Sequence, residues 1–107
     1  MRQGTTPSYA VTVAGYDLTD KAVFITLRGR MGRLVTKTGS DLTVTYDGTD
    51  SLIAFRLSQK ETLYLPVGNV GIQARFIDSE GVAYATNIVQ LSNLNILLNG
   101  EIDYKEG

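Results

Sequence analysis

Four cations, Arg28, Arg30, Arg33 and Lys37, gather in one short stretch of the sequence, with Gly29, Met31 and Gly32 among the residues between them. Such a cluster can bind nucleic acid or another anionic polymer. No aromatic residue is interleaved for base stacking, however, and the whole chain carries a net charge of −1. We therefore expect no nucleic-acid partner and a solvated hairpin tip whose arginines stand off a sheet. Pairing of these arginines with acids of a neighbouring subunit is an alternative that stays open.

Catalytic chemistry has few candidates. The chain has no Cys and no His, which excludes thiolate nucleophiles, Ser-His pairs and imidazole or thiolate metal ligands. No glycine-rich phosphate loop and no Gly-x-Ser-x-Gly elbow occurs. The carboxylates fall mostly in predicted turns, too dispersed for a glycosidase pair and too few in any loop for calcium. We expect that the protein is not an enzyme and that it binds no cofactor, metal or small-molecule ligand. A small hydrolase that uses carboxylates as catalytic groups is the weakest of the function classes considered.

Alternating apolar and polar residues dominate the chain, and this period of two is typical of half-buried antiparallel strands. Turn residues such as Asp47-Gly48-Thr49-Asp50 and Asp78-Ser79-Glu80-Gly81 separate the runs at roughly 8–12-residue spacing. The prediction is one all-β domain over residues 1–107, an immunoglobulin-like antiparallel sandwich of about seven to nine strands. The runs begin at Tyr9, Ala22, Leu42, Ile53, Val70 and Ala83.

One segment departs from this rhythm. Ser58 and Glu61 have the spacing of a capping box, which predicts a single helical turn near residues 58–62 that crosses between the sheets and ends before Pro66 and Gly68. Tyr64 beside it is a candidate for the tyrosine corner of sandwich folds.

The ends of the chain carry the remaining predictions. Residues 1–7 and 103–107 are expected to be mobile. The strands Tyr9–Val13 and Leu94–Leu98 are expected at sheet edges. Because Leu94–Leu98 is unusually apolar, we expect it to be covered by the sandwich itself or by a partner. Candidate partner contacts are Arg28, Arg30, Arg33, Leu94, Ile96 and Leu98. No secretory signal and no apolar run of roughly 18 residues occurs, so we expect cytoplasmic synthesis without membrane insertion.

The order of several short motifs resembles small proteins encoded among tail genes of phages and prophages of Gram-positive bacteria. It is also similar, more loosely, to the N-terminal domain of the phage baseplate upper protein family. The motifs are Arg2-Gln3-Gly4-Thr5-Thr6-Pro7, Asp17-Leu18-Thr19, Val23-Phe24-Ile25, residues 36–42, residues 57–63 and 70–78, and Tyr84-Ala85-Thr86.

This resemblance implies a non-enzymatic part of a virion tail, baseplate or fibre attachment, assembled in the host cytoplasm. Its partners would be other tail or baseplate proteins and copies of itself, and the family pattern brings no catalytic residues. An immunoglobulin-like adhesion or carbohydrate-binding module of a bacterial surface protein is the alternative. A sandwich without Cys is held by packing alone.

Overall fold

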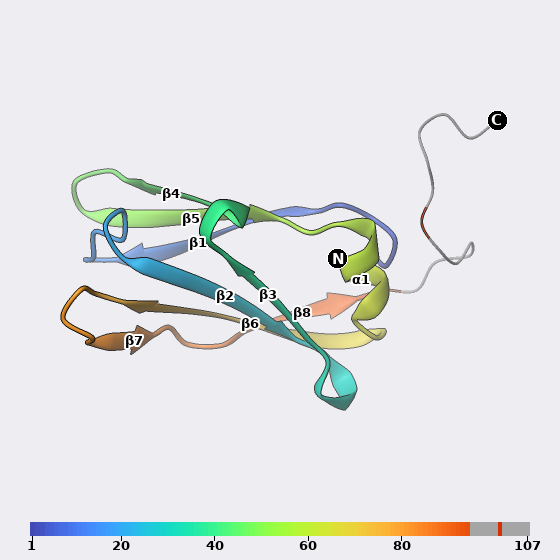
Figure 1. Ribbon diagram of the computed structural model, residues 1–107. Helices are drawn as coiled ribbons and strands as arrows, with labels where there is room; N and C mark the ends of the chain where they lie inside the picture. The colour runs from blue at the N-terminus through green and yellow to red at the C-terminus, as the bar shows by residue number, and fades with distance from the viewer. Residues whose placement is uncertain (95–100, 102–107) are drawn as a thin grey trace.

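Two antiparallel sheets face each other in the computed structural model (Figure 1), which describes residues 1–94 and 101. One sheet has the order β1-β5-β4; in the other, β3, β2 and β6 are neighbours, and β7 and β8 both pair with β6. The described residues thus contain eight strands, and the predicted all-β sandwich is confirmed. They are β1 (Ser8–Ala14), β2 (Ala22–Arg28), β3 (Leu34–Thr38), β4 (Leu42–Tyr46), β5 (Asp50–Arg56), β6 (Gly68–Ile77), β7 (Ala83–Ala85) and β8 (Val89–Asn93).

The pairing order is that of an immunoglobulin-like fold. Strands β1, β5 and β4 are neighbours in the way that strands B, E and D are in that fold, and β3, β2 and β6 correspond to C′, C and F. β7 and β8 together occupy the place of strand G beside β6. The connections between sheets are the β1–β2 loop, the β3–β4 turn and the segment between β5 and β6.

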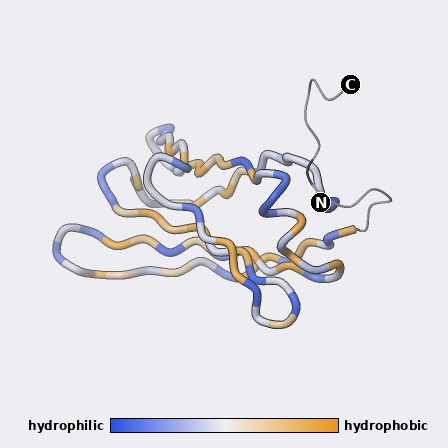
Figure 2. The backbone as a smooth tube through the Cα atoms, turned by 45° about the vertical axis from the view of Figure 1, so that its right-hand side comes forward, coloured by the Kyte–Doolittle hydropathy of each residue, from blue (hydrophilic) through white to orange (hydrophobic). Residues whose placement is uncertain are grey.

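The core lies between the sheets and is built from the predicted alternation. Along β2 and β6, every second residue is buried and its neighbours face outward, because successive side chains of a strand point to opposite faces. Figure 2 shows that hydrophobic positions follow the strands. The buried apolar residues are Val13, Leu18, Val23, Ile25, Leu27, Val35, Ile53, Phe55, Leu57, Leu65, Val70, Ile72, Ala74 and Phe76.

The predicted helical turn is α1 (Gln59–Tyr64). Its capping box forms as expected: the Glu61 N–H donates to Ser58 Oγ at 3.1 Å, and the Ser58 N–H donates to Glu61 Oε1 at 2.8 Å. The buried Asn93 amide at the end of β8 then fixes the helix, because its Nδ2 donates to the carbonyls of Thr62 (3.1 Å) and Leu65 (2.7 Å). This amide group ties the crossover to the five-stranded sheet.

The run from Ala83 to Leu91 is not one strand, contrary to the prediction. The Thr86 N–H donates to the Ala74 carbonyl (2.9 Å), while the Ala74 N–H donates to the Thr86 hydroxyl (3.0 Å) in place of a backbone carbonyl. This side-chain substitution interrupts the ladder and separates β7 from β8. In an unbroken strand, two residues an odd number of positions apart would face opposite sides of the sheet. The break shifts this alternation by one residue, so that Tyr84 and Leu91 both turn toward the interior.

Residues 1–7, expected above to be mobile, are hydrogen-bonded to three parts of the sandwich. Arg2 forms a parallel bridge with Leu94, in which the Gln3 N–H donates to the Leu94 carbonyl and the Leu94 N–H to the Met1 carbonyl. The carbonyls of Thr5 and Pro7 accept from the Thr62 hydroxyl and the Leu57 N–H. Polar backbone groups at the end of β8 explain this, because they need partners.

The predicted edges are partly borne out. Strand β1 is at an edge of the three-stranded sheet. The last strand described is β8, and of the predicted strand Leu94–Leu98 only Leu94 falls within the described residues; 95–98 and 103–107 lie outside them.

Candidate binding surface

A shallow groove of about 370 Å³ lies on the outer face of the five-stranded sheet, away from the core. Strands β2 and β6 form its floor, β3 flanks it on one side, and β8 with the residues just before it flanks the other. Its lining is Thr26, Arg28, Gly29, Arg30, Leu34, Asn69, Gly71, Gln73, Ile88 and Gln90.

Gly71 has no side chain, and this leaves space above the strands that form the floor of the groove. It pairs with Arg28 on one side and with Gln90 on the other, so it stands in the middle of the sheet. A Cβ at this position would lie 3.0 Å from Ile88 Cγ2, closer than ordinary van der Waals contact. The missing side chain therefore lets Ile88 lean over the sheet and form one wall of the groove.

The groove combines cationic, amide and apolar groups. Arg28 and Arg30 supply charge at one end, and Asn69, Gln73 and Gln90 supply amides that can bond to a backbone. The walls Leu34 and Ile88 are 53% and 59% exposed, which is much for aliphatic side chains. No aromatic ring lines the groove, so it lacks the stacking platform that a sugar would use. The arrangement fits an extended polypeptide that carries a carboxylate.

The four cations of the basic cluster are divided among different tasks. Arg28 and Arg30 line the groove. Arg33 instead reaches α1, where its Nη1 donates to the Tyr64 carbonyl at 3.1 Å and its guanidinium lies 5.1 Å from the centre of the Tyr64 ring. Lys37 Nζ forms an ion pair with Glu61 Oε1 at 2.6 Å. The cluster is therefore not a single patch, and two of its members hold the β2–β3 hairpin to the crossover.

Tyr64 is not a tyrosine corner. The residue is 47% exposed and its ring serves as a platform for Arg33, whereas a tyrosine corner is defined by a hydroxyl that bonds to the backbone a few residues upstream. Leu94 is also exposed, but it lies beside the bridge to Arg2 and does not line the groove. Ile96 and Leu98 lie outside the described residues.

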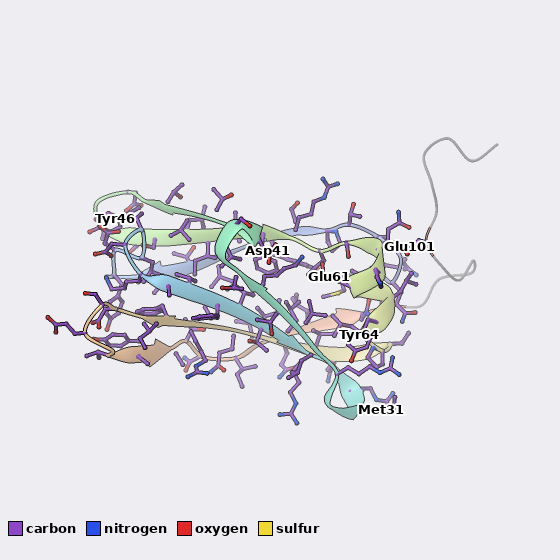
Figure 3. The ribbon with its side chains drawn as sticks, in the orientation of Figure 1. Met31, Asp41, Tyr46, Glu61, Tyr64 and Glu101 are labelled. Atoms are coloured by element: carbon purple, nitrogen blue, oxygen red, sulfur yellow. The ribbon has the colours of Figure 1, made fainter. Side chains whose placement is uncertain are left out.

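The tip of the β2–β3 hairpin projects from the sandwich (Figure 3). The short 3₁₀ segment η1 (Arg30–Gly32) forms it, with Met31 at φ 60° and ψ 20° and Gly32 at φ 71°. A left-handed backbone is uncommon for methionine. The Met31 side chain is 79% exposed, so the tip presents an apolar side chain between Arg30 and Arg33.

The opposite end of the sandwich carries aromatic rings and carboxylates. The rings of Tyr16, Phe76 and Tyr84 lie 5.1 to 5.3 Å apart, and the two tyrosines remain partly exposed. Hydrogen bonds from the Thr19 hydroxyl and N–H hold the pKa of Asp17 below its usual range.

Asp47 and Asp78 organise the hairpin loops at this same end. The N–H groups of Asp50 and Thr49 donate to Asp47 Oδ1 and lower the pKa of that carboxyl. Asp78 Oδ1 accepts from the N–H groups of Glu80 and Val82. The predicted turn roles of these two aspartates are confirmed.

Sequence reasoning missed most of the groove, although a signal was present. The outward-facing parity of β6 holds Asn69, Gly71 and Gln73, which the same alternation that predicts the core assigns to solvent. A glycine flanked by amides on an exposed face is a recognisable sign of close approach. Ile88 could not be placed, because its position depends on the break at Thr86.

Among residues 1–94 and 101, no group of three or more acidic side chains converges in a way that could hold a metal ion. Over the same residues, no helix has the length and apolar character needed to cross a membrane.

Comparisons with known proteins give no assignment. No protein-family model matches the sequence, and a search of curated proteins finds no match.

Proposed function

We propose that this chain is a non-enzymatic assembly module that acts through protein–protein contacts, and that the groove on the five-stranded sheet receives an extended acidic segment of its partner. The observation that carries this proposal is the composition of the groove: two arginines and three amides between exposed aliphatic walls. Backbone amides of an extended segment would bond to the amide side chains, and a carboxylate would pair with Arg28.

The setting we propose is the tail of a bacteriophage or prophage, at the baseplate or a fibre attachment, built in the host cytoplasm. Its support is the resemblance of the sequence motifs to small tail-region proteins. An immunoglobulin-like sandwich suits this role because it presents a rigid sheet face to a neighbour. The rival, a carbohydrate-binding module, finds less support in a groove without an aromatic ring.

Photocrosslinking tests this proposal. The chain is produced in a lysogen whose prophage carries it, with p-benzoylphenylalanine in place of Gln73 in the groove. A matched control places the same group at Thr12, which is exposed on the three-stranded sheet. Purified particles are then irradiated and analysed by mass spectrometry. We expect a covalent adduct with a tail protein from position 73 and none from position 12.

Charge reversal gives the second arm. Arg28→Glu should reduce the adduct at least tenfold, while Arg75→Glu, an identical change elsewhere on the same outer face, should leave it unchanged. Absence of the chain from purified particles would refute the tail assignment. Binding of the isolated chain to a glycan array, lost in Arg28→Glu, would instead establish the carbohydrate-binding alternative.

A further inference from the structure

Charge is segregated to the two ends of the sandwich. The end formed by the β1–β2, β4–β5 and β6–β7 connections carries six carboxylates and one lysine among the described residues: Asp17, Asp20, Asp47, Asp50, Asp78 and Glu80, with Lys21. The end that holds the β2–β3 tip, α1 and the N-terminal segment has six cations and two carboxylates within residues 1–94 and 101. These are Arg2, Arg28, Arg30, Arg33, Arg56 and Lys60, with Glu61 and Glu101; Lys37, Asp41 and Arg75 lie between the ends. A chain of net charge −1 therefore has two ends of nearly equal and opposite charge.

Each charged end also exposes uncharged side chains that can contact those exposed at the other end. The carboxylate end exposes Tyr16 and Tyr84, whose rings lie 5.3 Å apart on the buried Phe76. The cationic end exposes Met31 on a projecting tip between Arg30 and Arg33. Thioether sulfur and guanidinium groups both make favourable contacts with aromatic rings. Charge and side-chain chemistry thus match between the two ends.

We propose that the two ends bind each other in successive copies of this chain, so that the β2–β3 tip of one copy docks between the Tyr16 and Tyr84 loops of the next. The occupant is a second copy because the complementary surface is present on the same molecule. Contact between two different faces is heterologous, so each added copy leaves one free end and the row continues.

The expected affinity is low and dependent on salt. Two sheets about 10 Å apart with strands about 4.8 Å apart give an end of roughly 500 Å² per copy. Such a contact buries about 1,000 Å² in total, which is the size of weak interfaces. Charges on the surface are screened over about 10 Å at 0.1 M salt and about 3 Å at 1 M. Association should therefore appear at low salt and high concentration and vanish at 1 M salt.

The inference shares with the proposed function the premise that the chain binds protein, and it shares Arg28 and Arg30 with the groove, but its other residues lie at the ends of the sandwich. The two can fail separately. Crosslinking from Gln73 reports on the groove, whereas the solution mass of the purified chain reports on the ends.

Sedimentation equilibrium of the purified chain is the first test. In about 10 mM salt, the weight-average mass should rise with concentration beyond twice the 11.7 kDa of one chain, and in 1 M salt it should return to one chain. A mass that stays at one chain up to about 1 mM would overturn the proposal. A mass that stops at two chains would also overturn the proposal. It would mean that two copies pair side by side in opposite directions and so form a closed dimer, with no free end to which a third copy could bind.

Two variants then test the ends separately. Asp20→Lys/Glu80→Lys makes the carboxylate end nearly neutral, and neither side chain has a turn-forming role. Met31→Asp/Lys60→Glu weakens the other end; aspartate tolerates the left-handed backbone of the tip, so the fold should be kept. Each variant alone should remain a single chain. An equimolar mixture should give heterodimers that grow no further, because each contributes one intact end.

Controls separate end-to-end contact from general charge effects. The variant that combines all four changes has a net charge within one unit of the original, yet it should not associate. Arg75→Glu, outside both ends, should associate like the original chain. Circular dichroism and thermal unfolding establish that every variant is folded. Association of the four-change variant, or a mixture that remains at one chain, would refute the docking of these ends.

Discussion

Replacement of Met31 by asparagine should stabilise the protein. Residues Arg30 to Arg33 form a hairpin turn in which the Arg33 N–H donates to the Arg30 carbonyl at 3.4 Å. Met31 (φ 60°, ψ 20°) and Gly32 (φ 71°) have the two left-handed central positions of a type I′ turn. Asparagine and glycine are the residues that such positions favour, and methionine is not.

The size of the effect follows from the backbone alone. A left-handed conformation costs an ordinary residue about 1–2 kcal/mol, and asparagine lowers that cost through local hydrogen bonds. Because the Met31 side chain is 79% exposed, little packing is lost on its removal. We expect Met31→Asn to raise the free energy of unfolding by about 1 kcal/mol, or the midpoint temperature by about 4 °C.

Urea titration and thermal unfolding followed by circular dichroism measure this change. Gly32→Ala is the matched control: its Cβ would meet nothing within 4 Å, so any loss of stability, expected at about 1 kcal/mol, comes from the backbone conformation. An Met31→Asn protein that is no more stable than the original would refute the assignment of strain to the tip. The same variant should associate more weakly in low salt, since it lacks the thioether.

Three further changes test the remaining parts of the fold. Asn93→Leu should lower the free energy of unfolding by about 1–2 kcal/mol in urea titration, because the Thr62 carbonyl loses its donor while the Leu65 carbonyl keeps a bond from Gln3 Nε2. Burial raises the pKa of Glu61, but hydrogen bonds from Lys37 and the Ser58 N–H outweigh it, and the pKa lies below its usual value. This carboxylate therefore contributes stability that is present above about pH 4.5 and is lost as the pH falls through the folded pKa. Unfolding of Glu61→Gln between pH 6 and 3 should show a weaker dependence on pH than the original; an equal dependence would contradict this. Gly68→Ala should cost about 1–3 kcal/mol, because φ is +128° and the new Cβ would lie 2.7 Å from Arg30 Cδ; a neutral result would mean that the side chain moves without cost.

Features that depend on neighbours in the sequence were predictable. The alternation along β2, β5 and β6 identified their buried faces, and the spacing of Ser58 and Glu61 located α1. Both signals work because a strand repeats every two residues and a capping box closes over one turn of helix.

Features that depend on distant parts of the chain were not predictable in the same way. Strand β3 has only a short alternation and is defined by its pairing with β2. The break between β7 and β8 arises because the Thr86 hydroxyl takes the N–H of Ala74, a residue twelve positions earlier. Within the candidate site, Arg28 and Arg30 were found from their charge, but their separation from Arg33 and Lys37 required the positions of Tyr64 and Glu61.

The β2–β3 tip is where local preference and the observed structure disagree most. A type I′ turn with an exposed methionine at its first central position gives up about 1 kcal/mol that asparagine would supply. Arg33, in contrast, is held by two contacts to Tyr64, so the base of the tip is anchored to α1. A strained, exposed apolar residue on this anchored base lowers stability without adding to the core. We therefore expect the tip to take part in the proposed end-to-end contact, and the stability gained by Met31→Asn to be accompanied by weaker association.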